Sequence, residues 1–343
     1  MTRSRSFSDL WLAYRLRWKR RRYLFRAWRK ADQLRKVSDR RMHMSAEAML
    51  AVMTVRNEML RLPYFLDHHR RLGIDHFLIV DNASDDGTAD YLAAQPDVSL
   101  WSTPHSYRLS RFGVDWTTWL QNRFCHGHWC LTLDADELFI YPYWETRNLR
   151  ALAGWLDGSG QRSMAAMMLD LYPEGALSGT TYQPGQDPTT VLGWFDAGNY
   201  GIKTQEPLGN LWIQGGVRGR IFFADDPRRA PTLNKTPLVK WDRSFAYVNS
   251  THQLLPRGLN RNFGVDGHEV TSGILLHTKF LPQVVAKAAE EKDRREHFNN
   301  SALYEDYYDG LIADPRLWSP ASQRYAGWRQ LESLGLMSRG GWI

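Results

Sequence analysis

The chain has 343 residues, 43% of them hydrophobic and 24% charged, which is enough for a globular protein with an extensive core. Its two cysteines, Cys125 and Cys130, exclude a disulfide scaffold and favour a reducing compartment. Their segment CHGHWC matches no common zinc spacing, which favours packing over metal binding. The net charge of +7 is uneven, because residues 1–42 carry 15 Lys and Arg against 3 Asp and Glu. That segment has a net charge of +12, and the remainder carries −5.

The basic segment 8–42 predicts an amphipathic helix in an N-terminal unit over 1–45. Its aromatic residues recur near one helical face and are Trp11, Tyr14, Trp18, Phe25 and Trp28. The segment has no secretory signal pattern, and no run of about 18 apolar residues predicts a membrane span. The helix could lie on an anionic membrane, pack its aromatics on the body, or bind nucleic acid, which is the least favoured partner. We expect the first, in a cytoplasmic protein that is peripheral on the inner face of the plasma membrane.

Strand-like and helix-like segments alternate after residue 45. Apolar runs ending in polar residues predict strands over 49–58, 76–88, 98–104 and 129–137. Helical spacing predicts helices over 62–73 and 112–124. This alternation predicts an α/β fold with a mainly parallel sheet flanked by helices. In such sheets ligands bind beyond the carboxyl ends of the strands.

Three of these strands end in polar clusters, which should meet at one edge of the sheet. The clusters are Arg56-Asn57-Glu58, the segment 81–86, and the acids Asp134, Asp136 and Glu137. Carboxylates that follow a core strand this closely repel one another and indicate a nearby cation. Mg²⁺ or Mn²⁺, shared with a diphosphate, suits such oxygen ligands. The alternative is an acid-rich turn that caps a helix beginning at Leu138.

The motifs VRNE (55–58), VDNASDDGT (80–88) and LDADE (133–137), in this order, resemble family 2-type glycosyltransferases of the GT-A fold, and most closely a bacterial branch. The likeness is strong over 49–141 and weak over 214–222 and 275–281. It implies a catalytic domain over 46–281, with a nucleotide-binding half over 46–141 and an acceptor half over 142–281. It also implies metal-dependent transfer of a sugar from a nucleotide-sugar, with a UDP-sugar and inversion expected, to a glycan or lipid-linked acceptor.

The resemblance also implies roles for individual residues. Asp136 would bind Mn²⁺ or Mg²⁺ directly, Asp134 would reach the metal or the ribose, and His277 would be a further metal ligand. The expected contacts to the nucleotide-sugar are Arg56, Asn57, Glu58, Asp81, Asp85, Asp86, Asp134 and Lys279. The alternatives in which these residues have only structural roles are a surface ion pair at Arg56 and Glu58, a helix cap at Ser84 or Asp85, and a core histidine at His277.

The second half of the sequence gives fewer indications of structure and function. Residues 210–223 predict two strands around a glycine-rich turn, in which Arg218 and Arg220 could bind phosphate or simply belong to a hairpin. A strand over 272–281 would place Lys279 on the same face as His277. Residues 282–299 predict the first helix of a C-terminal helical segment, 282–343.

The general base is not evident, because the Glu-Asp pair usual in the resembled family is absent. Its candidates are Asp170, His252, Asp225 and Asp226. Two other functions stay open. A nucleotidyltransferase usually has a glycine-rich loop after the first strand, and residues 54–63 contain no glycine. A catalytically silent membrane- or RNA-binding protein would not need the three acid clusters.

Overall fold

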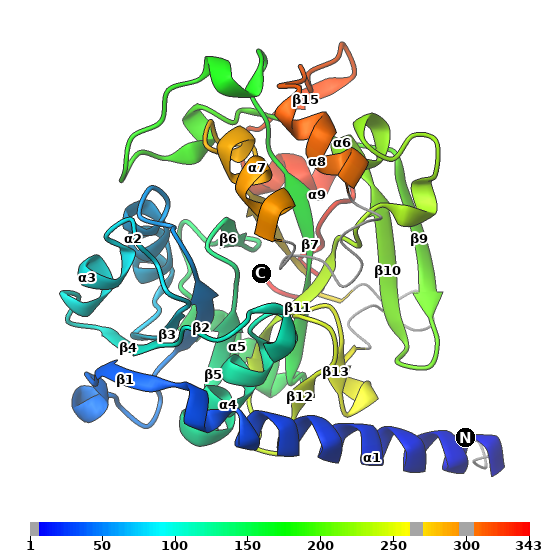
Figure 1. Cartoon of the computed structure of the whole chain (residues 1–343). Helices are drawn as coiled ribbons and strands as arrows, with labels where there is room; N and C mark the ends of the chain where they lie inside the picture. The colour runs from blue at the N-terminus through cyan, green and yellow to red at the C-terminus, as the bar shows by residue number, and fades with distance from the viewer. Residues whose placement is uncertain (1–6, 261–269, 295–304) are drawn as a thin grey trace.

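A computed structural model of the chain describes residues 7–260, 270–294 and 305–343. Its centre is a nine-stranded mixed sheet with the strand order β1-β4-β3-β2-β5-β11-β7-β14-β6 (Figure 1). Strands β4, β3, β2, β5, β7 and β14 point in one direction, and β1, β11 and β6 run opposite. The predicted α/β fold, with a mainly parallel sheet flanked by helices, is confirmed.

The elements have these bounds. The strands of the large sheet are β1 (Arg35–Ser38), β2 (Leu50–Val55), β3 (His76–Asp81), β4 (Val98–Ser102), β5 (Trp129–Thr132), β6 (Glu137–Ile140), β7 (Ser163–Asp170), β11 (Asn234–Lys240) and β14 (Gly273–His277). Short two-stranded sheets pair β9 (Tyr200–Gln205) with β10 (Asn210–Gly215), β12 (Ala246–Tyr247) with β13 (Leu254–Leu255), and β8 (Trp194–Asp196) with β15 (Ser322–Arg324). The α-helices are α1 (Phe7–Arg29), α2 (Leu62–Leu72), α3 (Thr88–Ala93), α4 (Val114–Phe124), α5 (Leu149–Gly158), α6 (Gly216–Ile221), α7 (Val284–Arg294), α8 (Glu305–Ile312) and α9 (Trp328–Ser333).

Both faces of the sheet are buried, which explains why its strands read as continuous apolar runs. Along β2, Ala51 and Met53 point into a core shared with α2 and α5, where Phe65 packs. The alternate residues Leu50 and Val52 point into a second core, shared with Trp116 of α4. The sheet is therefore a rigid layer between helices, and it holds the residues at its edge in fixed register.

The strand register brings the predicted polar clusters to one edge. Val55 at the end of β2 pairs with Asp81 at the end of β3. His277 at the end of β14 pairs with Asp170 of β7 on one side and with Glu137 of β6 on the other. Residues far apart in sequence thus meet where strands end, and both predicted halves of the 46–281 segment contribute to the same sheet.

The N-terminal segment is only partly the helix predicted over 8–42. Helix α1 ends at Arg29, and β1 pairs antiparallel with β4 as an edge strand of the large sheet. On its inner side, Leu16 of α1 packs with Leu208 and Leu255. The interpretation that the aromatics of α1 pack on the body is wrong, because all five predicted aromatic side chains are exposed. Within the described ranges, no helix has both the length and the apolar character needed to cross a bilayer.

Three local predictions are also corrected. Leu138 does not begin a helix, because 137–140 form strand β6. Residues 210–223 are not a hairpin, since β10 leads into the helix α6. Lys279 does not share a strand face with His277, because β14 ends at His277. The helix predicted over 282–299 begins as α7, and its last part, 295–299, lies outside the described residues.

Candidate active site

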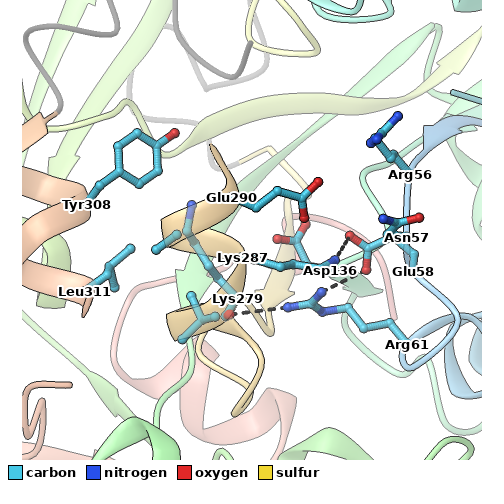
Figure 2. Close-up of a pocket in the computed structure, with 12 residues that line it drawn as sticks. Arg56, Asn57, Glu58, Arg61, Asp136, Lys279, Lys287, Glu290, Tyr308 and Leu311 are labelled. Carbon is cyan, nitrogen blue, oxygen red and sulfur yellow. Dashed lines mark hydrogen bonds and ion pairs between the residues drawn. The ribbon is translucent and has the colours of Figure 1, made fainter. Parts of the chain in front are cut away.

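A cavity of about 140 Å³ opens at the edge where the polar clusters meet (Figure 2). The loop after β2 and the start of α2 form one wall, and α7 and α8 form the opposite wall. The lining residues are Arg56, Asn57, Glu58, Arg61, Asp136, Lys279, Val284, Lys287, Ala288, Glu290, Tyr308 and Leu311. The C-terminal helices therefore cover a site whose polar groups come largely from the N-terminal half.

The acids after β5 lie in a tight turn between β5 and β6. Two of them share one cation from within the chain, because the Lys235 Nζ lies 2.7 Å from Asp134 Oδ2 and also forms an ion pair with Glu137. Lys235 and Glu137 are buried, whereas the Asp134 side chain is half exposed. The cation indicated by the sequence is thus supplied in part by Lys235 of β11.

The third acid, Asp136, faces a histidine. His277 Nε2 lies 3.1 Å from Asp136 Oδ2, and His277 Nδ1 lies 2.6 Å from Asp170 Oδ1. Arg218 Nε donates to the other oxygen of Asp170 at 2.7 Å. Asp136, His277, Asp170 and Arg218 therefore form a chain of alternating charge from the cavity wall into the interior. The backbone carbonyl of Asp136 also accepts from Thr278 N–H at 2.7 Å, which fixes the turn.

The pKa shifts follow from this alternation. Burial alone would raise the pKa of Asp136, but the facing His277, together with Arg61 and Lys279, lowers it well below its ordinary value. Burial of Asp170 is likewise outweighed by Arg218 and His277, which lower its pKa to about 2. Burial of His277 would lower its pKa, yet Asp136 and Asp170 raise it. Without a metal ion, the two carboxylates therefore favour the protonated form of this histidine.

The contacts among Asp136, His277 and Asp170 are those expected for a divalent metal bound by Asp136 and His277. Asp136 offers a carboxylate oxygen and His277 offers Nε2, while Asp170 holds the other ring nitrogen, as carboxylates commonly do behind a metal-binding histidine. No group of three or more potential protein ligands surrounds one point within the described residues. Mg²⁺-type sites commonly use only one or two carboxylates and complete their shell with phosphate oxygens and water. The predicted ligand Asp134 is instead engaged by Lys235.

The acids predicted to contact the nucleotide, Asp81, Asp85 and Asp86, differ in their hydrogen bonding. Asp81 is buried, and its Oδ1 has no hydrogen-bond partner in the part of the chain that the structure describes. Asp86 accepts the amide N–H groups of Met59 and Thr88, each at 3.0 Å, so it caps the start of α3. Asp85 is exposed, and its amide N–H donates to Asn57 Oδ1 at 2.9 Å. Capping at this loop therefore belongs to Asp86, and Asp81 retains an oxygen for a ligand.

Arg56 and Glu58 are tied into the walls rather than being a surface pair with each other. Arg56 Nη1 donates to the carbonyls of Asn82 and Ala83 at 2.9 and 3.0 Å, which joins the ends of β2 and β3. Glu58 pairs with Arg61 at 2.8 Å and with Lys287 of α7 at 2.7 Å (Figure 2). Glu58 is therefore the link between the wall at β2 and the wall at α7.

The predicted phosphate-binding residues differ in their surroundings. Arg220 is committed to Asp196, with both contacts at 2.9 Å, and lies outside the residues that line the cavity. Arg218 is buried, and its Nη2 has no hydrogen-bond partner among the described residues. Lys279 lines the cavity, with its ammonium 5.4 Å from the centre of the Tyr307 ring. Lys279 is thus the best placed of the three for a phosphate.

None of the base candidates is among the residues that line the cavity. Asp170 is engaged by Arg218 and His277. His252 Nδ1 donates to the Asn234 carbonyl at 2.6 Å, and burial, together with Lys235, lowers its pKa to about 4. Asp225 and Asp226 follow α6 on the surface side of the molecule, where Asp226 pairs with Arg228. The cavity lining therefore favours none of these four residues, and the identity of the base stays a prediction.

Sequence reasoning missed Lys235 and three cavity residues, Arg61, Lys287 and Glu290. Arg61 is buried, and its Nη2 donates to the carbonyls of Thr278 and Lys279 at 3.4 and 3.3 Å. No local motif marks Lys235 and Lys287, because their acidic partners lie more than 100 positions away, and the contact of Arg61 with the Thr278 carbonyl is equally distant in sequence.

No family model and no curated protein matches the chain. Among solved structures, a mannosyltransferase from Pyrobaculum calidifontis, in complex with GDP-Man and Mn²⁺, aligns with 19% identity and a TM-score of 0.28. The alignment covers 46% of this chain and 46% of that chain, so less than half of either protein is compared. A similarity this low establishes neither a family nor an activity.

Proposed function

We propose that this protein is a metal-dependent glycosyltransferase that moves a sugar from a nucleoside diphosphate sugar to a glycan or lipid-linked acceptor. A UDP-sugar is the expected donor, and inversion is the expected stereochemistry. The observation that carries the proposal is the meeting of three motif clusters at one edge of the sheet, two of which contribute Arg56 and Asp136 to the lining of one cavity. Binding beyond strand ends is usual in sheets of this kind.

The nucleotide is assigned to the ends of β2 and β3. Asp81 supports this assignment, because a buried carboxylate oxygen without a partner costs free energy unless a ligand supplies a donor. The imide N–H of a base or a ribose hydroxyl would be such a donor. The adjacent loop is rigid, since Asn57, Ser84 and Asp86 hold it by hydrogen bonds to backbone amides. Its shape is thus fixed before a nucleotide arrives.

The metal is assigned to Asp136 and His277. When bound, the ion would stabilise the negative charge that develops on the departing nucleoside diphosphate. Asp170 fixes the ring orientation of His277, and Arg218 in turn fixes Asp170. Since the pKa of Asp136 is lowered, this ligand is deprotonated at any physiological pH. The chain therefore presents one anionic and one imidazole ligand at the cavity wall.

The diphosphate is assigned to the cations of the cavity. Lys279 lies two residues beyond His277. Lys287 and Arg61 lie on opposite walls, and both form ion pairs with the carboxylate of Glu58. A phosphate that entered between the walls would compete with Glu58 for these cations. Arg61 is already positioned by the carbonyls of Thr278 and Lys279, so little ordering is needed for binding.

A donor screen tests this proposal. Thermal unfolding should be measured with a panel of nucleoside diphosphates and nucleotide-sugars, with Mn²⁺ and with a chelator. A ligand at 100 times its Kd should stabilise the folded protein by about 2.7 kcal/mol, and one nucleotide class should do so only with Mn²⁺. A triphosphate that stabilises the protein where no diphosphate sugar does would favour a nucleotidyltransferase. Stabilisation by none of them would contradict both enzyme assignments.

A further inference from the structure

The outward face of α1 carries a row of large apolar side chains. The members of this outer stripe are Phe7, Leu10, Trp11, Tyr14, Trp18, Phe25 and Trp28. Each is at least half exposed, from 50% at Tyr14 to 86% at Phe7. Neighbouring rings touch along the helix, with centroids 5.7 Å apart for Trp11 and Tyr14 and 6.2 Å apart for Tyr14 and Trp18. Water thus contacts a long apolar strip of a kind that folded proteins seldom leave uncovered.

The opposite face of α1 is fixed to the body, so the outer stripe cannot rotate inward. Leu16 packs with Leu208 and Leu255. Arg26 Nη2 lies 2.9 Å from the buried carboxylate of Asp115, and the guanidinium of Arg111 lies 4.0 Å from the Tyr23 ring centre. The buried residues of α1, Leu16 and Ala27, lie about 180° around the helix from Trp18 at 100° per residue. The stripe is therefore presented to the surroundings by a rigid scaffold.

Cations flank the stripe on both sides. Exposed basic side chains of α1 include Arg15, Arg17, Arg21, Arg22 and Arg29. Arg21 lies 5.4 Å from the Trp18 ring centre, so charge and aromatic surface are interleaved. Figure 1 shows α1 as a long straight helix along one edge of the molecule, with its N-terminal half extending beyond the sheet.

We propose that α1 docks this protein on an anionic lipid bilayer, with the outer stripe in the headgroup region and the flanking arginines on lipid phosphates. Aromatic rings prefer the membrane interface, and the adjacent cations are attracted by the negative surface potential. This inference is independent of the proposed activity, because it rests on α1 alone. A second copy of the chain is a poorer occupant, since two such helices would bring like charges together. Nucleic acid would satisfy the cations and leave most of the stripe in water.

Vesicle sedimentation with the full chain tests the proposal. Vesicles of phosphatidylglycerol and phosphatidylcholine should bind the protein, and pure phosphatidylcholine should bind it far more weakly. Binding should weaken as salt is raised from 0.05 to 0.5 M, because the electrostatic part is screened. Light scattering without vesicles reports self-association, and a labelled oligonucleotide added to the vesicles reports competition by nucleic acid.

Two sets of substitutions separate the contributions. The quadruple variant Arg15→Gln, Arg21→Gln, Arg22→Gln, Arg29→Gln should weaken binding about fivefold per charge, or about three orders of magnitude together. The triple variant Trp11→Ser, Trp18→Ser, Trp28→Ser should weaken binding at least about tenfold and keep the salt dependence. Matched controls elsewhere on the surface are Arg228→Gln and Leu334→Ser, which should bind as the wild type does. All of these positions are exposed, and circular dichroism checks the fold.

Three results would overturn the proposal. The first is equal binding to neutral and anionic vesicles with no effect of the arginine substitutions. The second is a stable dimer that the tryptophan variant dissociates, which would assign the stripe to a second copy. The third is displacement from vesicles by an oligonucleotide that binds more tightly and depends on the same tryptophans. Donor turnover in solution is unaffected by any of these outcomes, so the activity is tested separately.

Discussion

Lys235 and Asp134 lie 101 positions apart in sequence, yet the ammonium and the carboxylate are 2.7 Å from each other. Strand β11, which carries Lys235, inserts between β5 and β7 and runs antiparallel to both. Lys235 therefore reaches the acidic turn after β5 from a neighbouring strand and pairs with the buried Glu137 as well. This internal cation keeps the turn folded whether or not a metal is present.

Replacing Lys235 with Met should destabilise the fold strongly. Removing one partner of a buried ion pair typically costs about 3–5 kcal/mol, because the other charge remains buried without compensation. Urea unfolding should show a loss of this size in the free energy of unfolding. Lys240→Met is a matched control on the same strand, where a half-exposed pair with Asp157 should contribute under about 1 kcal/mol. Adding Glu137→Gln to Lys235→Met should restore part of the stability. Equal losses for Lys235 and Lys240 would contradict this account.

Replacing Asp136 with Asn should abolish most metal-dependent transfer. The variant keeps the size of the side chain and loses the anionic ligand, so we expect turnover to fall by about two to three orders of magnitude. Asp157→Asn, a substitution at an exposed acid outside the cavity, should leave turnover unchanged. Circular dichroism should show that both variants are folded. Full Mn²⁺-dependent turnover by Asp136→Asn would remove this residue from the metal site.

Replacing Asp81 with Ala should weaken nucleotide binding more than it slows the chemical step. A hydrogen bond between a charged carboxylate and the ligand contributes about 1.5–3 kcal/mol, so the Kd of the free nucleoside diphosphate should rise about 10- to 100-fold. Calorimetry measures this change directly. Asp90→Ala, at an exposed position in α3, is the control and should bind as the wild type does. An unchanged Kd for the Asp81 variant would move the nucleotide to another place.

The pH dependence of stability should follow His277. Its pKa is raised above 6.5 in the folded protein, so the folded state holds a proton that the unfolded state releases. The stabilisation is then complete below about pH 6.5 and is lost as pH rises through the raised pKa. Without metal, the Tm difference between wild type and His277→Gln should therefore be largest near pH 6 and shrink toward pH 9. A difference that grows with pH would contradict this assignment.

Metal binding should show the opposite trend over the same range. A metal ion needs the neutral imidazole, so it must displace the proton that His277 shares with Asp136. The affinity for Mn²⁺, measured by calorimetry without nucleotide, should rise as pH increases from 6 to 8.5. The variant His277→Gln should bind Mn²⁺ weakly at every pH. An affinity of the wild type for Mn²⁺ that does not change with pH would exclude His277 as a ligand.

The elements that local pattern determines could be predicted from the sequence. Strands β2 to β5 are buried on both faces, so each reads as an apolar run, and each predicted run contains the observed strand. Strand β1 was missed because Arg35 to Ser38 form a short, largely exposed edge strand without an apolar run. Helix α6 was mistaken for a turn, because Gly216 and Gly219 suggested a break in the chain. At Gly216 the backbone is indeed left-handed, with φ 61°, but a helix follows.

The candidate site was predictable only where a strand ends in its own motif. Asp81, Asp136 and His277 follow this rule, and the register of the sheet brings their strand ends to one edge. Contacts between residues far apart in sequence carry no local signal, which is why the ion pairs of Lys235 with Glu137 and of Arg218 with Asp170 were missed. The two partners of Asp170, Arg218 and His277, are likewise evident only from the fold.

The release of nucleoside diphosphate from a panel of nucleotide-sugars, with Mn²⁺ and with a chelator, tests the central claim most directly. The account predicts that one donor class is turned over with Mn²⁺, that the chelator stops the reaction, and that Asp136→Asn is inactive while Asp90→Ala is not. Metal-dependent turnover that survives in Asp136→Asn, or no turnover of any nucleotide-sugar by a folded protein that binds none of them, would contradict it.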